Sequence, residues 1–140
     1  MIAAIELEPF DIIGVPVEAH WDDLPRAVPA AWGDLFRSLP EARRFVEVSL
    51  DRRDAVYREI VGYVAEAGDV VPPGMIRYRV EGGAFLHAVH EGELHQIAER
   101  FAAIYAHAEV CGIKATDFKL DFGYTPGLPA GRHELYVRLG

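Results

Sequence analysis

The order of apolar and polar positions in the first half of the chain predicts two strands, a helix and two further strands. Apolar, β-compatible runs broken by turn residues place the strands at residues 2–7, 10–17, 45–50 and 57–65. The helix is expected at residues 27–39, where Trp32, Leu35, Phe36 and Leu39 recur every three or four positions and so share one face. Pro29 is tolerated only in the first turn of a helix, which places the expected helix start close to it, and Pro40 is expected to end the helix.

The second half of the chain repeats the same order of elements. Strands are expected at residues 76–80, 84–90, 118–122 and 133–139, with a helix at residues 93–107. The clearest loop, residues 66–74, falls at the midpoint between the halves. This pattern predicts an α+β domain over residues 1–140, built from two β-β-α-β-β units with pseudo-two-fold symmetry. The first repeat would cover about residues 1–70 and the second about 71–140, forming a mainly antiparallel sheet with two main helices.

Composition and charge narrow the class of protein. With 140 residues, 51% of them hydrophobic and 26% charged, the chain has the composition of one globular domain. Its 14 Lys and Arg against 22 Asp and Glu give a net charge of −8, which argues against direct nucleic-acid binding. The single cysteine, Cys111, excludes an internal disulfide. The chain has no run of about 20 apolar residues and no signal peptide, so a cytoplasmic protein without membrane contact is expected.

The histidines and potential nucleophiles of the sequence form no recognisable reactive site. His87 and His90 are three apart in an expected strand, so their side chains should point to opposite faces and not share an ion. The serines lack a nucleophile motif, and Cys111 follows a helix instead of beginning one. We therefore expect neither a metal nor a cofactor.

The last strand carries the most informative polar residues. Alternation places Glu134, Tyr136 and Arg138 on one face and His133 and Leu135 on the other. Glu134 would face either solvent or a cavity, and in a cavity an unpaired carboxylate must take up a proton or attract a cation. Aromatic rings around such a carboxylate would suit a flat organic cation.

Three short motifs, taken together, resemble the GyrI-like small-molecule-binding domain. The segment LEPFDIIGV (residues 7–15) is similar to the opening strand of that family, and VPPGM with VEGGAFLHAVHEG (residues 71–75 and 80–92) to the loop and hairpin that begin its second repeat. The segment ELYV (residues 134–137) is similar to its closing Glu-x-Tyr strand. The same domain forms the effector-binding half of multidrug-responsive AraC-type and MerR-type transcription regulators.

The resemblance implies a ligand cavity near the interface of the two repeats, and its better-known members bind lipophilic cations with an internal glutamate and aromatic rings. Glu134 and Tyr136 match the family motif, and Trp32 and Tyr105 occupy equivalent helix faces. The family often has Phe-Glu-x-Tyr in the penultimate strand, whereas this chain has FKLD at residues 118–121. Lys119 thus replaces the expected acid. Asp121, on the same face, could substitute for it, or Lys119 could pair with a carboxylate and weaken selectivity for cations.

The resemblance leaves several functions open. The leading expectation is binding of a hydrophobic, cationic or amphipathic small molecule by a stand-alone domain, since the sequence contains no helix-turn-helix; a transcriptional role would then need a separate partner. Some members instead hydrolyse cyclopropane-containing genotoxic natural products, with Glu134 as a candidate general base and Tyr136 as a hydrogen-bond donor. The family also includes an inhibitor of DNA gyrase, so a protein partner is a third expectation. A related haem-binding family shares the fold, but no histidine here can be singled out as an axial ligand.

Overall fold

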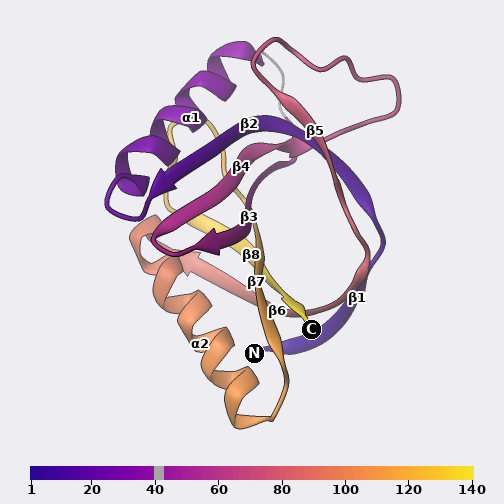
Figure 1. Ribbon diagram of the computed structural model, residues 1–140, viewed down its shortest axis with the longest axis vertical. Coiled ribbons are helices and arrows are strands. Elements are labelled where there is room, and N and C mark those ends of the chain that lie inside the picture. The colour runs from indigo at the N-terminus through magenta and orange to yellow at the C-terminus, as the bar shows by residue number, and fades with distance from the viewer. Residues whose placement is uncertain (40–42) are drawn as a thin grey trace.

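The eight strands of the computed structural model form one antiparallel sheet, and two helices pack on it (Figure 1). The structure describes residues 1–39 and 43–140. The elements in chain order are β1 (Ala3–Leu7), β2 (Phe10–His20), α1 (Leu24–Ser38), β3 (Phe45–Arg53), β4 (Val56–Val64), β5 (Ile76–Val80), β6 (Gly83–Gly92), a 3-10 turn η1 (Leu94–Gln96), α2 (Ile97–Val110), β7 (Ala115–Phe122) and β8 (Gly131–Leu139). The predicted α+β class and the order of elements are confirmed.

The two halves of the chain exchange their first strands. The strand order is β1-β6-β8-β7-β3-β4-β2-β5, so β1 pairs with β6 of the second half and β5 pairs with β2 of the first. The sheet is continuous because β3 and β7 pair at its centre. In Figure 1, β1 and β2 bend together along the right of the molecule and cross the bent β5 and β6 there.

The pairing register shows the pseudo-two-fold symmetry directly. Glu47 on β3 lies opposite Asp121 on β7, and the two positions are 121 − 47 = 74 residues apart. On the outer strands β2 and β6 the offset is 73, and the same offset relates the buried helix residues Ala31 and Leu35 to Ile104 and Ala108. The axis therefore passes through the Glu47–Asp121 pair, at the middle of the sheet.

The two faces of the sheet carry different cores. On one face, α1 packs through Trp32 and Leu35 on β2, β3 and β4, and α2 packs through Ile104 on β6 and β8. On the opposite face, side chains from all eight strands form a third cluster in which Phe85, Phe122 and Tyr136 are buried. The bent outer strands close over this third cluster, so both faces of the central strands are covered.

Both predicted helices are displaced from their expected limits. The first begins at Leu24, three residues before the predicted start, and Pro29 lies inside it. Pro25 takes the first-turn position that the prediction gave to Pro29. The second helix begins at Ile97, after the 3-10 turn, and continues to Val110, three residues past its predicted end. Pro40, which was expected to end the first helix, lies outside the described residues.

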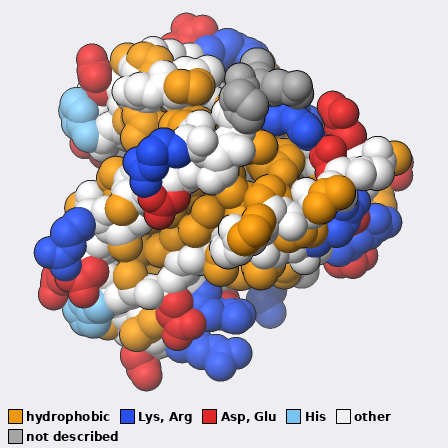
Figure 2. All heavy atoms as spheres, turned by 90° about the horizontal axis from the view of Figure 1, so that it is seen from above, with side chains coloured by type: hydrophobic (Ala, Val, Ile, Leu, Met, Phe, Trp, Pro, Cys, Tyr) orange, Lys and Arg blue, Asp and Glu red, His pale blue; other side chains and the backbone are white. Residues whose placement is uncertain are grey.

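Charged side chains surround an apolar surface on the face drawn in Figure 2. Hydrophobic side chains gather over the middle of this face, and basic and acidic ones are interspersed toward its edge. Among the described residues, neither helix is both long and apolar enough to cross a membrane.

Candidate functional site

A cleft lies between the two helices, above the centre of the sheet. Its larger part is a cavity of about 550 Å³, walled mainly by Leu24, Val28 and Trp32 of α1 on one side and by Leu94 and Ala98 of η1 and α2 on the other. An adjoining cavity of about 470 Å³ continues along α2, past Phe101 and Tyr105, and shares Glu47, Leu94, Ala98 and Tyr124 with the first. The apolar walls follow from the amphipathic pattern of the helices, whose core-facing stripes extend beyond what the sheet covers.

Three carboxylic acids form the floor of the cleft. Glu47 and Asp121 face each other across β3 and β7, and Glu59 projects from the neighbouring strand β4. Their side chains all point to the helix-covered face because strand alternation places them opposite the core residues Val48, Ile60 and Leu120. Glu59 is only 7% exposed, and its Oε1 atom has no hydrogen-bond partner among the described residues.

Burial and mutual repulsion change the acidity of this floor. The pKa of Glu47 is held well above its ordinary value, first by burial and then by the nearby Glu59 carboxyl, although the Trp32 indole donates a hydrogen bond to Glu47 Oε1 at 3.0 Å. Burial also raises the pKa of Glu59. Two carboxyl groups that are close together in a weakly solvated site cannot both ionise easily. This pair of carboxyls therefore favours a bound proton, and a nearby cation would favour the ionised form.

Asp121 is the structurally fixed member of the three acids. It is 3% exposed, and it accepts hydrogen bonds from the Tyr124 hydroxyl and from His133 Nδ1, both at 2.7 Å. Burial and the neighbouring carboxyls raise the pKa of Tyr124 far above its ordinary value, so the phenol stays a donor. These two donors leave Glu47 and Glu59 as the acids that can respond to a ligand.

Aromatic rings fill the α1 end of the cleft. Trp32 is 1% exposed and lies against Phe36, Phe45 and Tyr124, with ring centroids 5.3, 6.1 and 4.5 Å away. Its indole N–H is directed to Glu47. Trp32 therefore belongs to the hydrophobic wall of the cleft and also contacts its acidic floor.

The other end of the cleft, along α2, is more polar. The Tyr105 hydroxyl donates to the Thr116 carbonyl at 2.6 Å, and burial raises the pKa of Tyr105 to about 12. Lys119 lies beside it, with its Nζ 5.7 Å from the centre of the Tyr105 ring. The offset of 73 residues, 105 − 32, places Tyr105 at the position on α2 that corresponds to Trp32 on α1.

The structure divides the predicted site residues between two faces. Trp32, Tyr105 and Asp121 belong to the cleft between the helices. Glu134 and Tyr136 lie on the opposite face of β8, as the alternation predicted, and Tyr136 is packed in the third core cluster. Their roles in binding or hydrolysis, which the resemblance implies, stay predictions.

Glu134 has its own surroundings on that second face. Its Oε1 is 3.1 Å from His87 Nε2, and its Oε2 is 3.9 Å from Arg132 Nη1. The His87 ring in turn lies 4.7 Å from the ring of Tyr136. Glu134 thus has cationic or hydrogen-bonding partners within the protein, whereas Glu59 has an orphaned oxygen.

Sequence reasoning missed Glu47 and Glu59. The available signal was the position of each acid inside an otherwise apolar strand, in FVEV at residues 45–48 and EIVGYV at residues 59–64. Among the described residues, no group of three histidine, cysteine or acidic side chains is arranged to hold a metal ion.

Comparison with known proteins supports the fold. No family model matches the chain. The transcriptional regulator BrlR of Pseudomonas aeruginosa is 37% identical over 51 residues, a match that spans 36% of this chain and 19% of BrlR. The chain therefore resembles only a small part of that regulator.

Solved structures match over nearly the whole chain. An integron cassette protein of Vibrio cholerae has a TM-score of 0.73 at 12% identity and covers 99% of this chain and 95% of its own. SAV2435 bound to tetraphenylphosphonium also has a TM-score of 0.73, at 6% identity, and the match covers 100% of this chain and 94% of SAV2435. The C-terminal domain of EcmrR has a TM-score of 0.70 at 10% identity, and the match covers 100% of this chain and 97% of that domain.

The fold is thus the one that the integron cassette protein, SAV2435 and the C-terminal domain of EcmrR share. The resemblance to the GyrI-like domain is confirmed at this level.

Proposed function

We propose that this domain binds a hydrophobic organic cation in the cleft between α1 and α2, with Glu47 and Glu59 as the counter-charge. The observation that carries the proposal is Glu59, a buried carboxyl with an orphaned oxygen that lines an apolar cavity. A buried polar atom without a partner costs free energy, so such an atom is retained where a ligand can satisfy it.

The shape and lining of the cleft support a ligand of drug-like size. Cavities of about 550 and 470 Å³ fall within the range of about 300–1,000 Å³ that is usual for small-molecule sites. The half-buried ring of Tyr124, which packs on Trp32 and lines both cavities, can contact a delocalised cation. The tetraphenylphosphonium bound to SAV2435 is a ligand of this chemical class on the same fold.

Replacement of Glu59 by glutamine tests the proposal. Glutamine keeps the size of the side chain and removes its charge, so we expect Glu59→Gln to weaken binding of tetraphenylphosphonium by about tenfold or more, as loss of a partly buried charge contact does. Isothermal titration calorimetry with the purified protein measures this directly. The change in Trp32 fluorescence gives a second measure in a Trp21→Phe background, because Trp21 is exposed.

Glu134→Gln is the matched control, since it removes a glutamate charge from the opposite face. Full binding by Glu134→Gln and weakened binding by Glu59→Gln would support the cleft. The reverse result would assign the site to Glu134 and Tyr136 and overturn the proposal, as would the absence of binding by the wild-type protein.

A further inference from the structure

Along the floor of the cleft, a pair of acidic residues is followed by a serine–lysine pair. Glu47 lies opposite Asp121, and two residues further along β3 Ser49 lies opposite Lys119. Alternate residues of a strand point to the same face and lie about 7 Å apart. An acidic pair and a serine–lysine pair are therefore neighbours, and all four residues line the same cavity.

Lys119 has unused hydrogen-bonding capacity. Its ammonium group makes one hydrogen bond, to the Asp117 carbonyl oxygen at 3.3 Å. Burial lowers the pKa of Lys119, and the Asp117 and Glu59 carboxyls raise it in part, although neither forms an ion pair with it. The rings of Phe101 and Tyr105 flank it, with centroids 6.0 and 5.7 Å from Nζ. An ammonium group carries three donors, so Lys119 can still bind an anionic oxygen.

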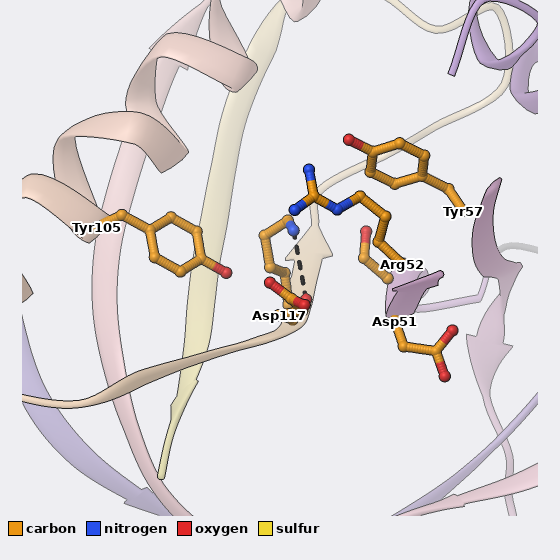
Figure 3. A pocket seen from close by; sticks show the side chains of 7 residues that line it. Asp51, Arg52, Tyr57, Tyr105 and Asp117 are labelled. Atoms are coloured by element: carbon orange, nitrogen blue, oxygen red, sulfur yellow. Dashed lines mark hydrogen bonds between the residues drawn. The ribbon is translucent and has the colours of Figure 1, made fainter. Parts of the chain in front are cut away.

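The mouth of the cleft beyond Lys119 also carries a net positive charge (Figure 3). Ser49, Tyr105 and Lys119 also line a smaller cavity of about 250 Å³, where Tyr105 points from α2 toward Asp117, and Arg52 and Tyr57 lie on the other side. Asp51 is neutralised by Arg58, whose Nε donates to it at 2.8 Å. Arg52 and Lys119 against Asp117 leave a charge of 2 − 1 = +1.

We propose that the ligand of this cleft is an organic cation that also carries a carboxylate, bound with its cationic end at Glu47 and Glu59 and its carboxylate at Lys119. The inference rests on the proposed function and adds the chemical class of the ligand. The pseudo-two-fold axis relates the two ends of the cleft, which differ because Lys119 takes the place that Phe45 has in the first repeat (119 − 45 = 74).

Two dyes that differ by one methyl ester test this class. Rhodamine 110 is a xanthylium cation with a free carboxylate, and rhodamine 123 is its methyl ester. An acidic floor alone favours the ester, since the carboxylate of rhodamine 110 would be repelled. We expect the wild-type protein to bind rhodamine 110 more tightly than rhodamine 123 in fluorescence polarisation titrations.

The variant Lys119→Met removes the charge and keeps the length of the side chain. We expect it to weaken binding of rhodamine 110 by about tenfold or more, the usual effect of losing a hydrogen bond to a charged group, and to leave rhodamine 123 unchanged or bound more tightly. Lys114→Met, at an exposed position outside the cleft, is the matched control and should change neither dye. Thermal unfolding of each variant checks that it is folded.

The outcomes separate this inference from the proposed function. The ligand class is wrong if the wild-type protein prefers the ester and Lys119→Met affects binding of both dyes equally. The cation site remains in that case if rhodamine 123 binds and Glu59→Gln weakens its binding. If neither dye binds while tetraphenylphosphonium does, the ligand class alone is overturned; if tetraphenylphosphonium also fails to bind, both proposals are overturned. A preference for the free acid that disappears only in Lys119→Met supports the carboxylate subsite.

Discussion

Glu47 and Glu59 are unusual because neither forms an ion pair among the described residues, although Lys119 is near enough to offset in part the rise that burial causes in the pKa of Glu59. Asp121 is held by Tyr124 and His133, while Glu47 receives only the indole N–H of Trp32. The raised pKa values of Glu47 and Glu59 mean that this pair of carboxyls keeps a proton to a higher pH than a free carboxyl in water does. Ligand binding should therefore be linked to ionisation.

We predict that binding of tetraphenylphosphonium releases protons. The cation favours the ionised carboxylates and lowers their raised pKa values, so affinity should increase as the pH rises above the ordinary pKa of a glutamate and level off above the raised values. Calorimetric titrations at one pH, in phosphate and in Tris, give the number of protons from the difference in observed enthalpy. We expect a release that approaches about one proton per ligand.

The variants distinguish the source of these protons. Glu59→Gln removes one carboxyl and the repulsion that raises the pKa of Glu47, so proton release should fall, whereas Glu134→Gln should leave it unchanged. Equal enthalpies in both buffers for the wild-type protein would show that the acids are already ionised in the empty cleft.

At the scale of residues, the sequence predicted which side chains share a face but not which face is the site. Alternation separated Glu134 and Tyr136 from His133 and Leu135 correctly. It could not show that the helices leave a cleft over β3 and β7, because that depends on which strands become neighbours. Glu47 and Glu59 gain their importance only from this pairing across the sheet.

At the scale of elements, α1 contains a proline where a regular helix would have a backbone donor. Pro29 is the sixth residue of the helix, so the Pro25 carbonyl four residues earlier lacks its usual partner. Both prolines line the cleft. The helix is therefore less stable than its sequence length suggests, along the wall that a ligand would touch.

We predict that Pro29→Ala stabilises the protein. An interior proline costs about 3 kcal/mol relative to alanine, and the stiffer unfolded chain offsets up to about 1 kcal/mol, so the free energy of unfolding should rise by about 2 kcal/mol. Urea unfolding followed by circular dichroism measures the change. Pro25→Ala is the control and should gain little, because proline is compatible with the first turn. A loss of stability in Pro29→Ala would mean that packing of the ring in the cleft outweighs the helix defect.

The same proline explains the error in the predicted helix start. The rule that proline belongs to the first turn was correct, but Pro25 satisfies it and Pro29 does not. The strands were easier to predict because each is an apolar, β-compatible run that ends at turn residues. The extension of the second helix to Val110 includes Ala108, which is buried just past His107, although Val110 itself is exposed.

At the scale of the whole molecule, exchange of the first strands makes the halves dependent on each other. Without the second half, β1 would lose its only partner, β6, and β2 would lose β5. The acidic floor also needs both halves, since Glu47 and Glu59 come from the first and Asp121 from the second. A near-symmetric sheet thus builds one cleft, and differences such as Lys119 against Phe45 give that cleft two unlike ends.

We predict that residues 1–74 and 75–140 do not fold separately but assemble when mixed. The break falls in the loop between β4 and β5, so every strand remains intact, while each fragment alone exposes strand edges and half of the third core cluster. Near-ultraviolet circular dichroism should show little tertiary structure for either fragment and a recovered signal for the equimolar mixture. Size-exclusion chromatography should place that mixture at the size of the intact chain. A cooperative thermal transition of either fragment as a monomer would show instead that each repeat has a sufficient core of its own, and that strand exchange is an addition to two stable units.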